Sequence, residues 1–274
     1  MTCPLCGTLL TNLSDKRFAI CRNDGLVVNG AHEFRRYEHD YFEQEYRNQY
    51  GRSYTEDRQA ILARNEIRFD KIRDLAPVTT HAQVLEVGSA AGYFLKIMQE
   101  AGYSVRGWEI SEAMTKYSNA RGIKTVQQDF LKGAALHEKQ KKQPYDIVAM
   151  FYVLEHIPEQ KLVWQKLAGL VRPGGYLLLA LPSADGPTFR FHRQRWYDTH
   201  PLDHSVDYSP RSLRLAGRQF GFQLVAAFSE GIHPQRFPLG SFRVPAWFYR
   251  RALEKAPLGD TIFAILRREQ SPSP

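Results

Sequence analysis

Residues 83–94 read Gln-Val-Leu-Glu-Val-Gly-Ser-Ala-Ala-Gly-Tyr-Phe, and this stretch decides the fold of the chain. Its first part, 84–87, is a short apolar run that predicts a buried parallel strand. Small residues follow at 88–92, and helical periodicity begins at Tyr93. A strand, a small-residue turn and a helix form a crevice for nucleotide-like ligands, because small side chains let a ligand approach the backbone. Such turns also occur without a ligand, so the turn alone leaves both interpretations open.

An acidic residue beside the turn narrows the kind of ligand. Glu86 would repel a pyrophosphate group but would suit a cationic ligand. Residues 86–92, Glu-Val-Gly-Ser-Ala-Ala-Gly, resemble the first motif of class I S-adenosylmethionine-dependent methyltransferases, acidic-x-Gly-x-Gly-x-Gly, with Ala90 at the middle glycine. The resemblance implies an α/β fold, Rossmann-like and doubly wound around a seven-stranded sheet, with S-adenosylmethionine as the methyl donor.

A second acidic residue follows at the spacing expected for an adenosine ligand. Residues 104–110 predict a strand, and Glu109 at its end lies about twenty residues past the glycine turn. A carboxylate in this position hydrogen-bonds ribose hydroxyls, although a surface glutamate at a strand end is also common. Ser111 predicts the N-cap of the next helix.

The later strands carry the most specific local motif. Residues 145–152 predict a fourth strand, which runs into Leu-Glu-His-Ile-Pro at 154–158. This stretch resembles the Leu-Glu-His-x-Pro segment of class I methyltransferases that act on small molecules. The Asn/Asp-Pro-Pro-Tyr/Phe motif of enzymes that methylate base nitrogens does not occur there. Strands are also predicted at 124–127 and 176–181, and at 222–229 and 261–267 as antiparallel neighbours at one sheet edge.

The resemblance implies a set of cofactor contacts around these motifs. Glu86 is expected to bind the methionyl amine and Glu109 the ribose. Asp129 would accept a hydrogen bond from the adenine amino group, with the ring packed on Phe130. The expected cofactor-binding residues are Glu86, Gly88, Ser89, Ala90, Gly92, Tyr93, Phe94, Glu109, Ile110, Asp129, Phe130, Phe151 and Glu155.

All three cysteines lie near the N-terminus, in a segment (residues 1–30) that we call the knuckle. The N-terminal sequence lacks the basic and apolar regions of a signal peptide, which predicts a cytoplasmic protein. An odd number of cysteines in such a protein favours a metal site or free thiols over a disulfide. The Cys-x-x-Cys turn is similar to a zinc ribbon, but Asp24 stands where the fourth cysteine would be. The expected zinc ligands are Cys3, Cys6, Cys21 and Asp24. A site completed by His32 or His39, or a knuckle without metal, is the alternative.

The sequence predicts three parts. The knuckle at 1–30 precedes a helical lid or linker at 31–76 and a methyltransferase domain at 77–274, which has a substrate-binding insertion near 186–210. Aromatic residues at 37, 41, 42, 46, 50 and 54 predict one helical face, either packed on the main domain or covering the cofactor. No apolar run approaches the ~20 residues that span a bilayer. The net charge of +8 suits an anionic partner without choosing one.

Candidate bases and acceptor contacts lie toward the C-terminus. A hydroxyl or carbon-acid acceptor needs a base, for which His204 is the first candidate, followed by His156 and His200. Each is otherwise a structural histidine that bonds to a loop. Arginines at 190, 193 and 195 beside Trp196 suit a phosphorylated or nucleotide-linked acceptor, or simply form a solvated helix.

The order of these motifs resembles bacterial methyltransferases for sugars and other small metabolites. In that family, the segment around 204–210 lies over the cofactor and carries substrate contacts. The resemblance therefore implies a small-molecule acceptor, without a nucleic-acid partner. The alternative is an RNA methyltransferase that uses the knuckle and the basic surface to bind RNA. The acceptor atom and the oligomeric state are not determined by the sequence.

Overall fold

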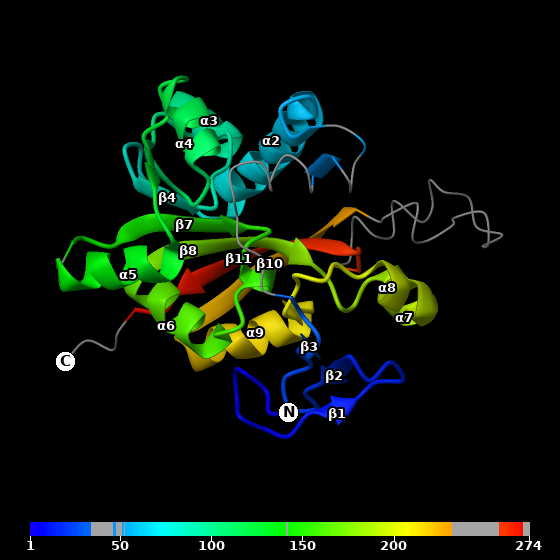
Figure 1. The fold of residues 1–274 in the computed structure, drawn as a ribbon. Coiled ribbons are helices and arrows are strands. Elements are labelled where there is room, and N and C mark those ends of the chain that lie inside the picture. The colour runs from blue at the N-terminus through cyan, green and yellow to red at the C-terminus, as the bar shows by residue number, and fades with distance from the viewer. Residues whose placement is uncertain (34–45, 48–50, 52, 141, 232–257, 271–274) are drawn as a thin grey trace. The chain divides into compact units, whose positions relative to one another are not determined.

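The computed structural model describes residues 1–33, 46–47, 51, 53–140, 142–231 and 258–270 (Figure 1). Two compact units make up the chain. Unit 1 comprises Met1–Phe34, Tyr152–Gln165 and Leu179–Leu266, and unit 2 comprises Arg35–Phe151, Lys166–Leu178 and Arg267–Pro274. Of the sequence predictions, His39 and the aromatic residues at 37, 41, 42 and 50 lie outside the described residues.

A seven-stranded sheet has the order β10-β11-β8-β7-β4-β5-β6. Its strands are β4 (Gln83–Val87), β5 (Ser104–Glu109), β6 (Thr125–Gln127), β7 (Tyr145–Phe151), β8 (Val171–Pro182), β10 (Phe222–Gly231) and β11 (Thr261–Arg268). β4 pairs in parallel with both β5 and β7, and β5 pairs in parallel with β6. The order confirms the predicted Rossmann-like α/β fold, with β10 and β11 adjacent at one edge.

One strand begins earlier than its sequence pattern predicted. Helix α6 (Gln160–Leu170) ends directly before β8, so the Arg-Pro-Gly-Gly stretch at 172–175 belongs to the strand rather than to a turn. The Arg172 side chain forms an ion pair with Asp146 at the start of β7. A side chain at Gly175 would lie 2.7 Å from the Asp146 carbonyl oxygen, so glycine is needed for this close approach.

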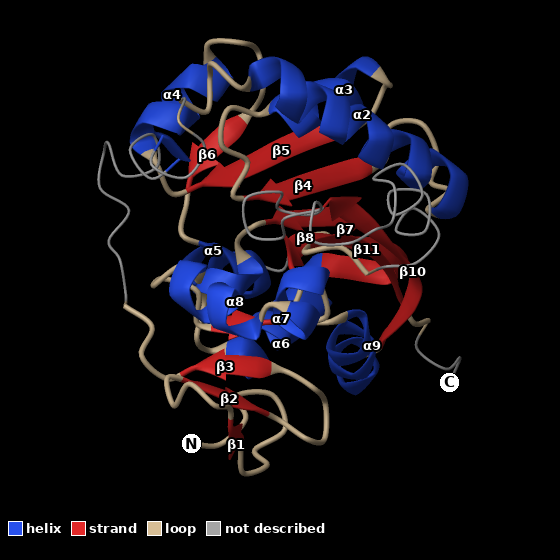
Figure 2. Cartoon of the chain, turned by 90° about the vertical axis from the view of Figure 1, so that its right-hand side faces the viewer, coloured by secondary structure: helices blue, strands red, loops and turns tan. Residues whose placement is uncertain are grey.

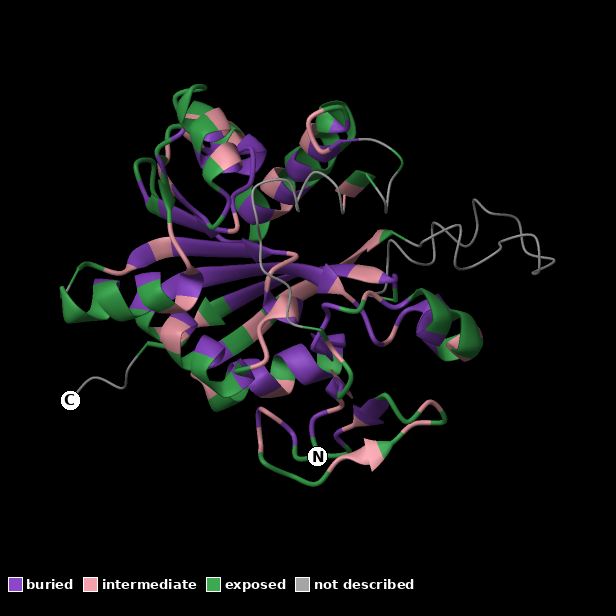
Figure 3. Ribbon diagram, in the orientation of Figure 1, coloured by how far each residue is buried: buried purple, intermediate pink, exposed green. Residues whose placement is uncertain are grey.

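In unit 2, helices cover the parallel strands. They are α2 (Arg58–Leu75), α3 (Tyr93–Glu100), α4 (Glu112–Asn119) and α5 (Phe130–Lys139). Figure 2 shows α2, α3 and α4 along one side of β4, β5 and β6. Residues 84–87 are all buried, as the apolar run predicted, and Figure 3 shows the central strands buried along most of their length. The strand–turn–helix that opens this unit is therefore anchored on a buried strand.

Unit 1 contains a second, smaller sheet of order β1-β2-β3-β9. It consists of β1 (Thr11–Asn12), β2 (Phe18–Ile20), β3 (Val27–Asn29) and β9 (Val206–Asp207), all paired antiparallel. Its described helices include the 3-10 helix η1 (Leu154–His156), α7 (Pro187–Phe191), α8 (Arg193–Thr199) and α9 (Pro210–Gln219). The sequence did not reveal that the knuckle takes its fourth strand from the C-terminal half of the chain.

Candidate functional site

The turn between β4 and α3 has the backbone of a ligand-binding glycine turn. Gly88 and Gly92 have φ values of +71° and +74°, in the left-handed region. A side chain at Gly92 would lie 2.5 Å from Ser118 Oγ, so only glycine fits there. Ala90 also has a positive φ, +44°, although this conformation costs an L-residue about 1–2 kcal/mol. Ala90 thus keeps the left-handed backbone conformation although the motif has a glycine at this position.

Glu86, on β4 next to this turn, is buried, and the described residues offer too few hydrogen-bond donors for its carboxyl group. The residue is 5% exposed, and its Oε2 atom has no hydrogen-bond partner among the residues that the structure describes. Burial raises the pKa of its carboxyl well above the usual value, Arg68 opposes this effect, and Glu109 adds to it. A buried carboxylate oxygen without a donor is costly, and a bound ammonium group would supply that donor.

Glu109 connects the turn to the next helix. Its Oε2 accepts a hydrogen bond from the Ala90 N–H at 2.7 Å, and its Oε1 accepts one from the Ser111 N–H at 2.8 Å. Burial raises its pKa, and the backbone hydrogen bonds oppose that rise. Each oxygen keeps a further lone pair with which to accept a ribose hydroxyl. Beside its predicted ligand role, Glu109 therefore has a structural role that its spacing did not reveal.

The remaining predicted residues of unit 2 follow the carboxyl ends of the parallel strands. Asp129, after β6, is the N-cap of α5, because its Oδ1 accepts a hydrogen bond from the Lys132 N–H at 2.9 Å. Phe130 is buried, whereas Ile110 beside Glu109 is 40% exposed. Ser89 Oγ is a second buried polar atom without a partner among the described residues. Carboxyl ends of neighbouring parallel strands form the ligand-binding edge of such sheets.

Aromatic side chains pack beside the first residue of α3. The Tyr54 ring stacks on the Tyr93 ring, with centroids 5.7 Å apart and an interplanar angle of 4°. Tyr46 packs edge-on against Tyr54 at 5.2 Å and donates a hydrogen bond to Asp57 Oδ2 at 2.6 Å. These two described members of the predicted aromatic face therefore pack on the strand–turn–helix.

Two further predicted residues of this unit contact each other. The Phe94 and Phe151 rings meet edge-on with centroids 5.0 Å apart. The Arg68 guanidinium lies over the Phe151 ring at 4.3 Å.

In unit 1, residues 200–207, which we call the histidine segment, gather imidazoles and carboxylates. His200 Nε2 lies 2.8 Å from Asp207 Oδ2, and both side chains are buried. His156 Nδ1 lies 3.4 Å from Asp203 Oδ2. The His204 ring meets the His156 ring edge-on at 4.8 Å and the His200 ring at 5.4 Å. The structure therefore brings the three candidate histidines together and adds two carboxylates, Asp203 and Asp207, that no local sequence pattern indicated.

Glu155 lies beside these histidines and is 1% exposed. Burial raises its pKa to about 7, and its Oε2 has no hydrogen-bond partner within the described part of the chain. Burial lowers the pKa of His156, but the hydrogen bond with Asp203 and the charge of Glu155 outweigh that effect and raise it. Ser205 donates from both its N–H and its Oγ to the Glu155 carbonyl, at 2.8 and 2.9 Å.

The knuckle brings together its three thiols and a carboxylate. Cys3 Sγ lies 3.2 Å from Asp24 Oδ2, and Cys6 Sγ lies 3.5 Å from Cys21 Sγ. All four potential ligand atoms lie within 4.8 Å of one another, an arrangement that suits a four-coordinate zinc ion. Burial raises the pKa of the Cys3 thiol. His32, the alternative fourth ligand, instead bonds through Nδ1 to the Asn29 carbonyl at 3.0 Å.

The arginines around α7 and α8 already make contacts within the chain. Arg190 forms an ion pair with Asp185 at 2.6 Å. The Arg193 guanidinium lies over the Phe189 ring at 3.5 Å, and its Nε donates to the Phe189 carbonyl at 2.6 Å. These contacts weaken the expectation of a three-arginine phosphate site.

Comparison with known proteins agrees with this geometry. The profile of a methyltransferase-domain family matches residues 54–227. The chain belongs to this family. The ubiquinone biosynthesis O-methyltransferase of Bordetella avium is 28% identical over 173 residues, which cover 60% of this chain and 71% of that protein. The enzyme of the same name from Shewanella pealeana is 29% identical over 118 residues, 42% of this chain and 50% of that protein.

Solved structures of methyltransferases share the fold. A SAM-dependent methyltransferase from Archaeoglobus fulgidus has a TM-score of 0.58 at 16% identity, covering 82% of this chain and 99% of that one. Magnesium protoporphyrin IX methyltransferase from Synechocystis PCC 6803, solved with bound SAH, has a TM-score of 0.55 at 15% identity, covering 84% and 98%. This methyltransferase is therefore an enzyme of the class I, S-adenosylmethionine-dependent type, as its motifs predicted.

Proposed function

We propose that this methyltransferase transfers the methyl group of S-adenosylmethionine to a hydroxyl oxygen or an acidic carbon of a small molecule, a sugar or another metabolite. One observation carries the proposal. The buried Oε2 of Glu86, beside a glycine turn, has no hydrogen-bond donor among the described residues, and the amine of the cofactor would supply one. The relatives named for O-methylation in ubiquinone biosynthesis support a small-molecule acceptor. The cofactor supplies an electrophilic methyl group, so the protein's task is chiefly to align the reactants and exclude water.

The proposed cofactor contacts follow the edge of unit 2. Glu86 would hold the amine of the methionyl part, and the backbone of residues 88–92 would approach it closely. Glu109 would bind the ribose hydroxyls, for which the exposed Ile110 provides an apolar neighbour. The second oxygen of Asp129 would accept the adenine amino group beside Phe130. The predicted set also includes Gly88, Ser89, Ala90, Gly92, Tyr93, Phe94 and Phe151, and Glu155 of unit 1.

For the acceptor we propose the part of unit 1 where residues of the histidine segment line a small pocket. It is lined by Thr188, Trp196, His200, His204, Asp207 and Asp260, among others. The volume of this pocket is about 10 Å³, room for little more than a water molecule, so the acceptor would place only its reacting hydroxyl there. His204, or else His156, would take the proton of the acceptor hydroxyl, and the freed oxygen lone pair would form the bond to the methyl carbon as the sulfur leaves. The histidine then returns its proton to water.

A narrower form of the proposal is a phosphorylated or nucleotide-linked acceptor, which the arginines at 190, 193 and 195 beside Trp196 would contact. The competing RNA methyltransferase would show binding to RNA whose affinity falls steeply with salt.

None of the helices in the described segments has the length and apolar character to cross a membrane. A cytoplasmic location stays a prediction.

We also propose one structural zinc ion in the knuckle, held by Cys3, Cys6, Cys21 and Asp24. Four protein ligands leave no open position for chemistry, so this metal would stabilise the fold. Elemental analysis should find about one equivalent per chain. Asp24→Cys should slow zinc loss to a chelator, because a thiolate binds zinc more strongly. A folded, metal-free protein would contradict this part.

Calorimetry tests the cofactor site. Glu86→Gln should weaken S-adenosylmethionine binding by about tenfold or more, since a charge-assisted hydrogen bond is lost. Glu100→Gln, on the exposed end of α3, is the matched control and should bind as the wild type does. Unchanged affinity in Glu86→Gln would remove Glu86 from the site.

Turnover tests the acceptor site. His204→Ala should lower kcat by about 10²–10⁴ with nearly unchanged cofactor affinity. Wild-type turnover in this variant would refute His204 as the base, and His156→Ala would be examined next.

A further inference from the structure

We propose that Asn29 and Phe18 of the knuckle are positioning residues for the histidine segment, so that the knuckle sets the rate of methyl transfer without taking part in cofactor binding. The inference rests on the proposed function in one respect, that His204 acts on the acceptor. It assigns to the knuckle a role in catalysis beyond holding a metal ion.

The first support is the backbone of the histidine segment. Asn29 Nδ2 donates to the His204 carbonyl at 3.0 Å, and the Asn29 N–H donates to the Ser205 carbonyl at 2.9 Å. Asn29 is 3% exposed, and its Oδ1 accepts a hydrogen bond from the Ala31 N–H at 3.0 Å, so both ends of its amide are fixed. Directly beyond Ser205, β9 pairs with β3, with Val27 opposite Asp207. One residue therefore holds the backbone of the proposed base.

The second support is an aromatic contact from β2. The Phe18 ring is buried and meets the His200 ring edge-on at 4.8 Å. It also packs edge-on against Trp196 at 4.9 Å and stacks on Tyr197 at 5.4 Å with an interplanar angle of 17°. Phe18 thus forms the surface against which the His200 imidazole and the end of α8 are packed.

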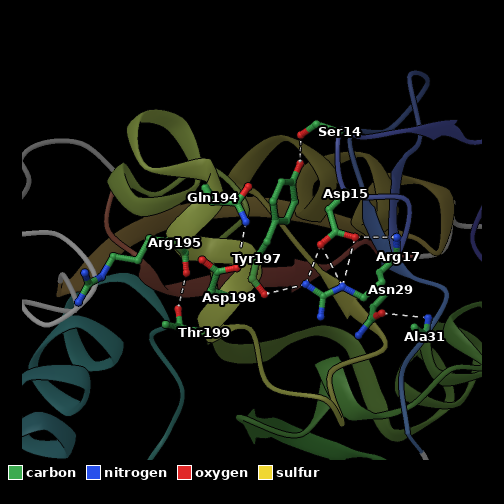
Figure 4. Close-up of polar contacts among 10 residues, drawn as sticks. All are labelled: Ser14, Asp15, Arg17, Asn29, Ala31, Gln194, Arg195, Tyr197, Asp198 and Thr199. Atoms are coloured by element: carbon green, nitrogen blue, oxygen red, sulfur yellow. Dashed lines mark hydrogen bonds and ion pairs between the residues drawn. The ribbon is translucent and has the colours of Figure 1, made fainter.

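The third support is a polar anchor at the edge of this contact, which Figure 4 shows. Ser14 Oγ lies 3.1 Å from the Tyr197 hydroxyl, and Arg17 Nη2 donates to the Tyr197 carbonyl at 3.1 Å. Asp15 fixes the Arg17 guanidinium through an ion pair of 2.6 Å. These side chains come from the β1–β2 turn, so this turn and the first residue of β2 both contact α8 or the residue that follows it.

The opposite flank of the histidine segment is held by η1, through the two hydrogen bonds from Ser205 to the Glu155 carbonyl. The segment is therefore clamped between η1 and β3. Loosening the β3 side leaves the imidazole of His204 free to shift, and a displacement of about 1 Å at a reacting group can cost roughly a hundredfold in rate.

The central experiment compares Asn29→Ala with Asn12→Ala. Asn12 is an exposed residue of β1 in the same small sheet, so its variant is a matched control. Asn29→Ala should lower kcat by about tenfold to a hundredfold, with the cofactor Kd within about twofold of wild type. NMR of labelled imidazoles should show shifted His200 and His204 resonances in Asn29→Ala and unshifted ones in Asn12→Ala, at equal zinc content. A folded Asn29→Ala enzyme with wild-type kcat and unshifted imidazoles would overturn the inference.

If Asn29→Ala does not fold, two milder variants decide. Arg17→Ala removes an exposed contact to Tyr197, and Phe18→Leu keeps an apolar side chain while losing the ring. Both should lower kcat and shift the His200 resonance without changing cofactor affinity, and wild-type behaviour in both would overturn the inference. His204→Ala separates this proposal from the previous one. Wild-type turnover in His204→Ala would refute the proposed base. If His204→Ala has a low kcat but Asn29→Ala has the kcat of wild type, only the positioning role is refuted.

Discussion

Ala90 lies in the left-handed region, between two glycines that share this conformation, and its methyl group is buried. We expect Ala90→Gly to change the free energy of unfolding by less than about 1 kcal/mol, because relief of backbone strain is offset by a lost methyl contact and a more flexible unfolded chain.

Ala90→Val should instead destabilise by about 2–4 kcal/mol, since it combines overpacking with a β-branched residue at positive φ. Ala91→Val, at a buried position without positive φ, is the control for added volume. Urea unfolding of the variants measures the difference. Equal losses at 90 and 91 would show that backbone strain is unimportant.

The buried carboxyl of Glu155, with its pKa raised to about 7, makes stability depend on pH. Between the unfolded pKa and about 7, the native state keeps a proton that the unfolded state has released. The free energy of unfolding therefore falls as pH rises through this window and levels off above it, by about 3 kcal/mol in total. His156, whose pKa is also raised, contributes in the same direction, because its stabilising proton is lost as pH rises.

Glu155→Gln should remove most of this decline, because the amide stays neutral. In urea unfolding at pH 5 and pH 8, the free energy of unfolding of the variant relative to wild type should be higher at pH 8 than at pH 5. Parallel pH profiles for the two proteins would mean that Glu155 is ionised at low cost in the native state.

Residues within a local motif were predictable, and residues brought in from elsewhere were not. Glu86 and Glu109 follow from their spacing to a strand and a glycine turn. Asp203 lies 47 positions from its partner His156, and no local pattern records such a contact. The role of Asn29 could not be predicted for the same reason, because Asn29 is 175 positions from the His204 carbonyl to which it donates.

At the scale of elements, the start of α9 shows how a short polar pair fixes a helix. Ser209 and Ser212 form a reciprocal capping box, and Pro210 occupies the first turn. Ser209→Ala should therefore cost about 1 kcal/mol of stability. In a double-mutant cycle with Ser212→Ala the two losses should not add, because each side chain satisfies the other's backbone. Ser104→Ala, at the exposed start of β5, is the control for urea unfolding, and strict additivity would argue against the box.

Elements with an apolar pattern of their own were predicted better than elements whose bounds depend on contacts with distant residues. The strands β4 and β7 have the apolar runs that burial on both faces requires, and α3 begins at Tyr93, where its periodicity predicted. The two-residue strand β9 has no such run, because its place is set by pairing with β3. β8 begins before its predicted start because the Arg172–Asp146 ion pair and Gly175 extend the pairing.

At the scale of the whole molecule, cofactor binding should raise resistance to unfolding. A ligand at 100 times its Kd that binds only the native state adds about 2.7 kcal/mol. Glu109→Ala should lose most of this gain and should also be less stable without cofactor, because the Ala90 and Ser111 N–H groups lose their acceptor. Urea midpoints with and without S-adenosylmethionine measure both effects. A full cofactor-induced shift in Glu109→Ala would remove Glu109 from the ribose site.

The pairing of β3 with β9 also has a consequence for biosynthesis. Val27 leaves the ribosome roughly 180 residues before its partner Asp207. At a synthesis rate of about 5–20 residues per second, some ten to forty seconds pass before the strand that covers the edge of β3 is made. During that interval the nascent knuckle exposes an unpaired edge that other chains can join, so a chaperone or early zinc capture would protect it. Slowing translation between these two positions should therefore increase aggregation of the newly made enzyme.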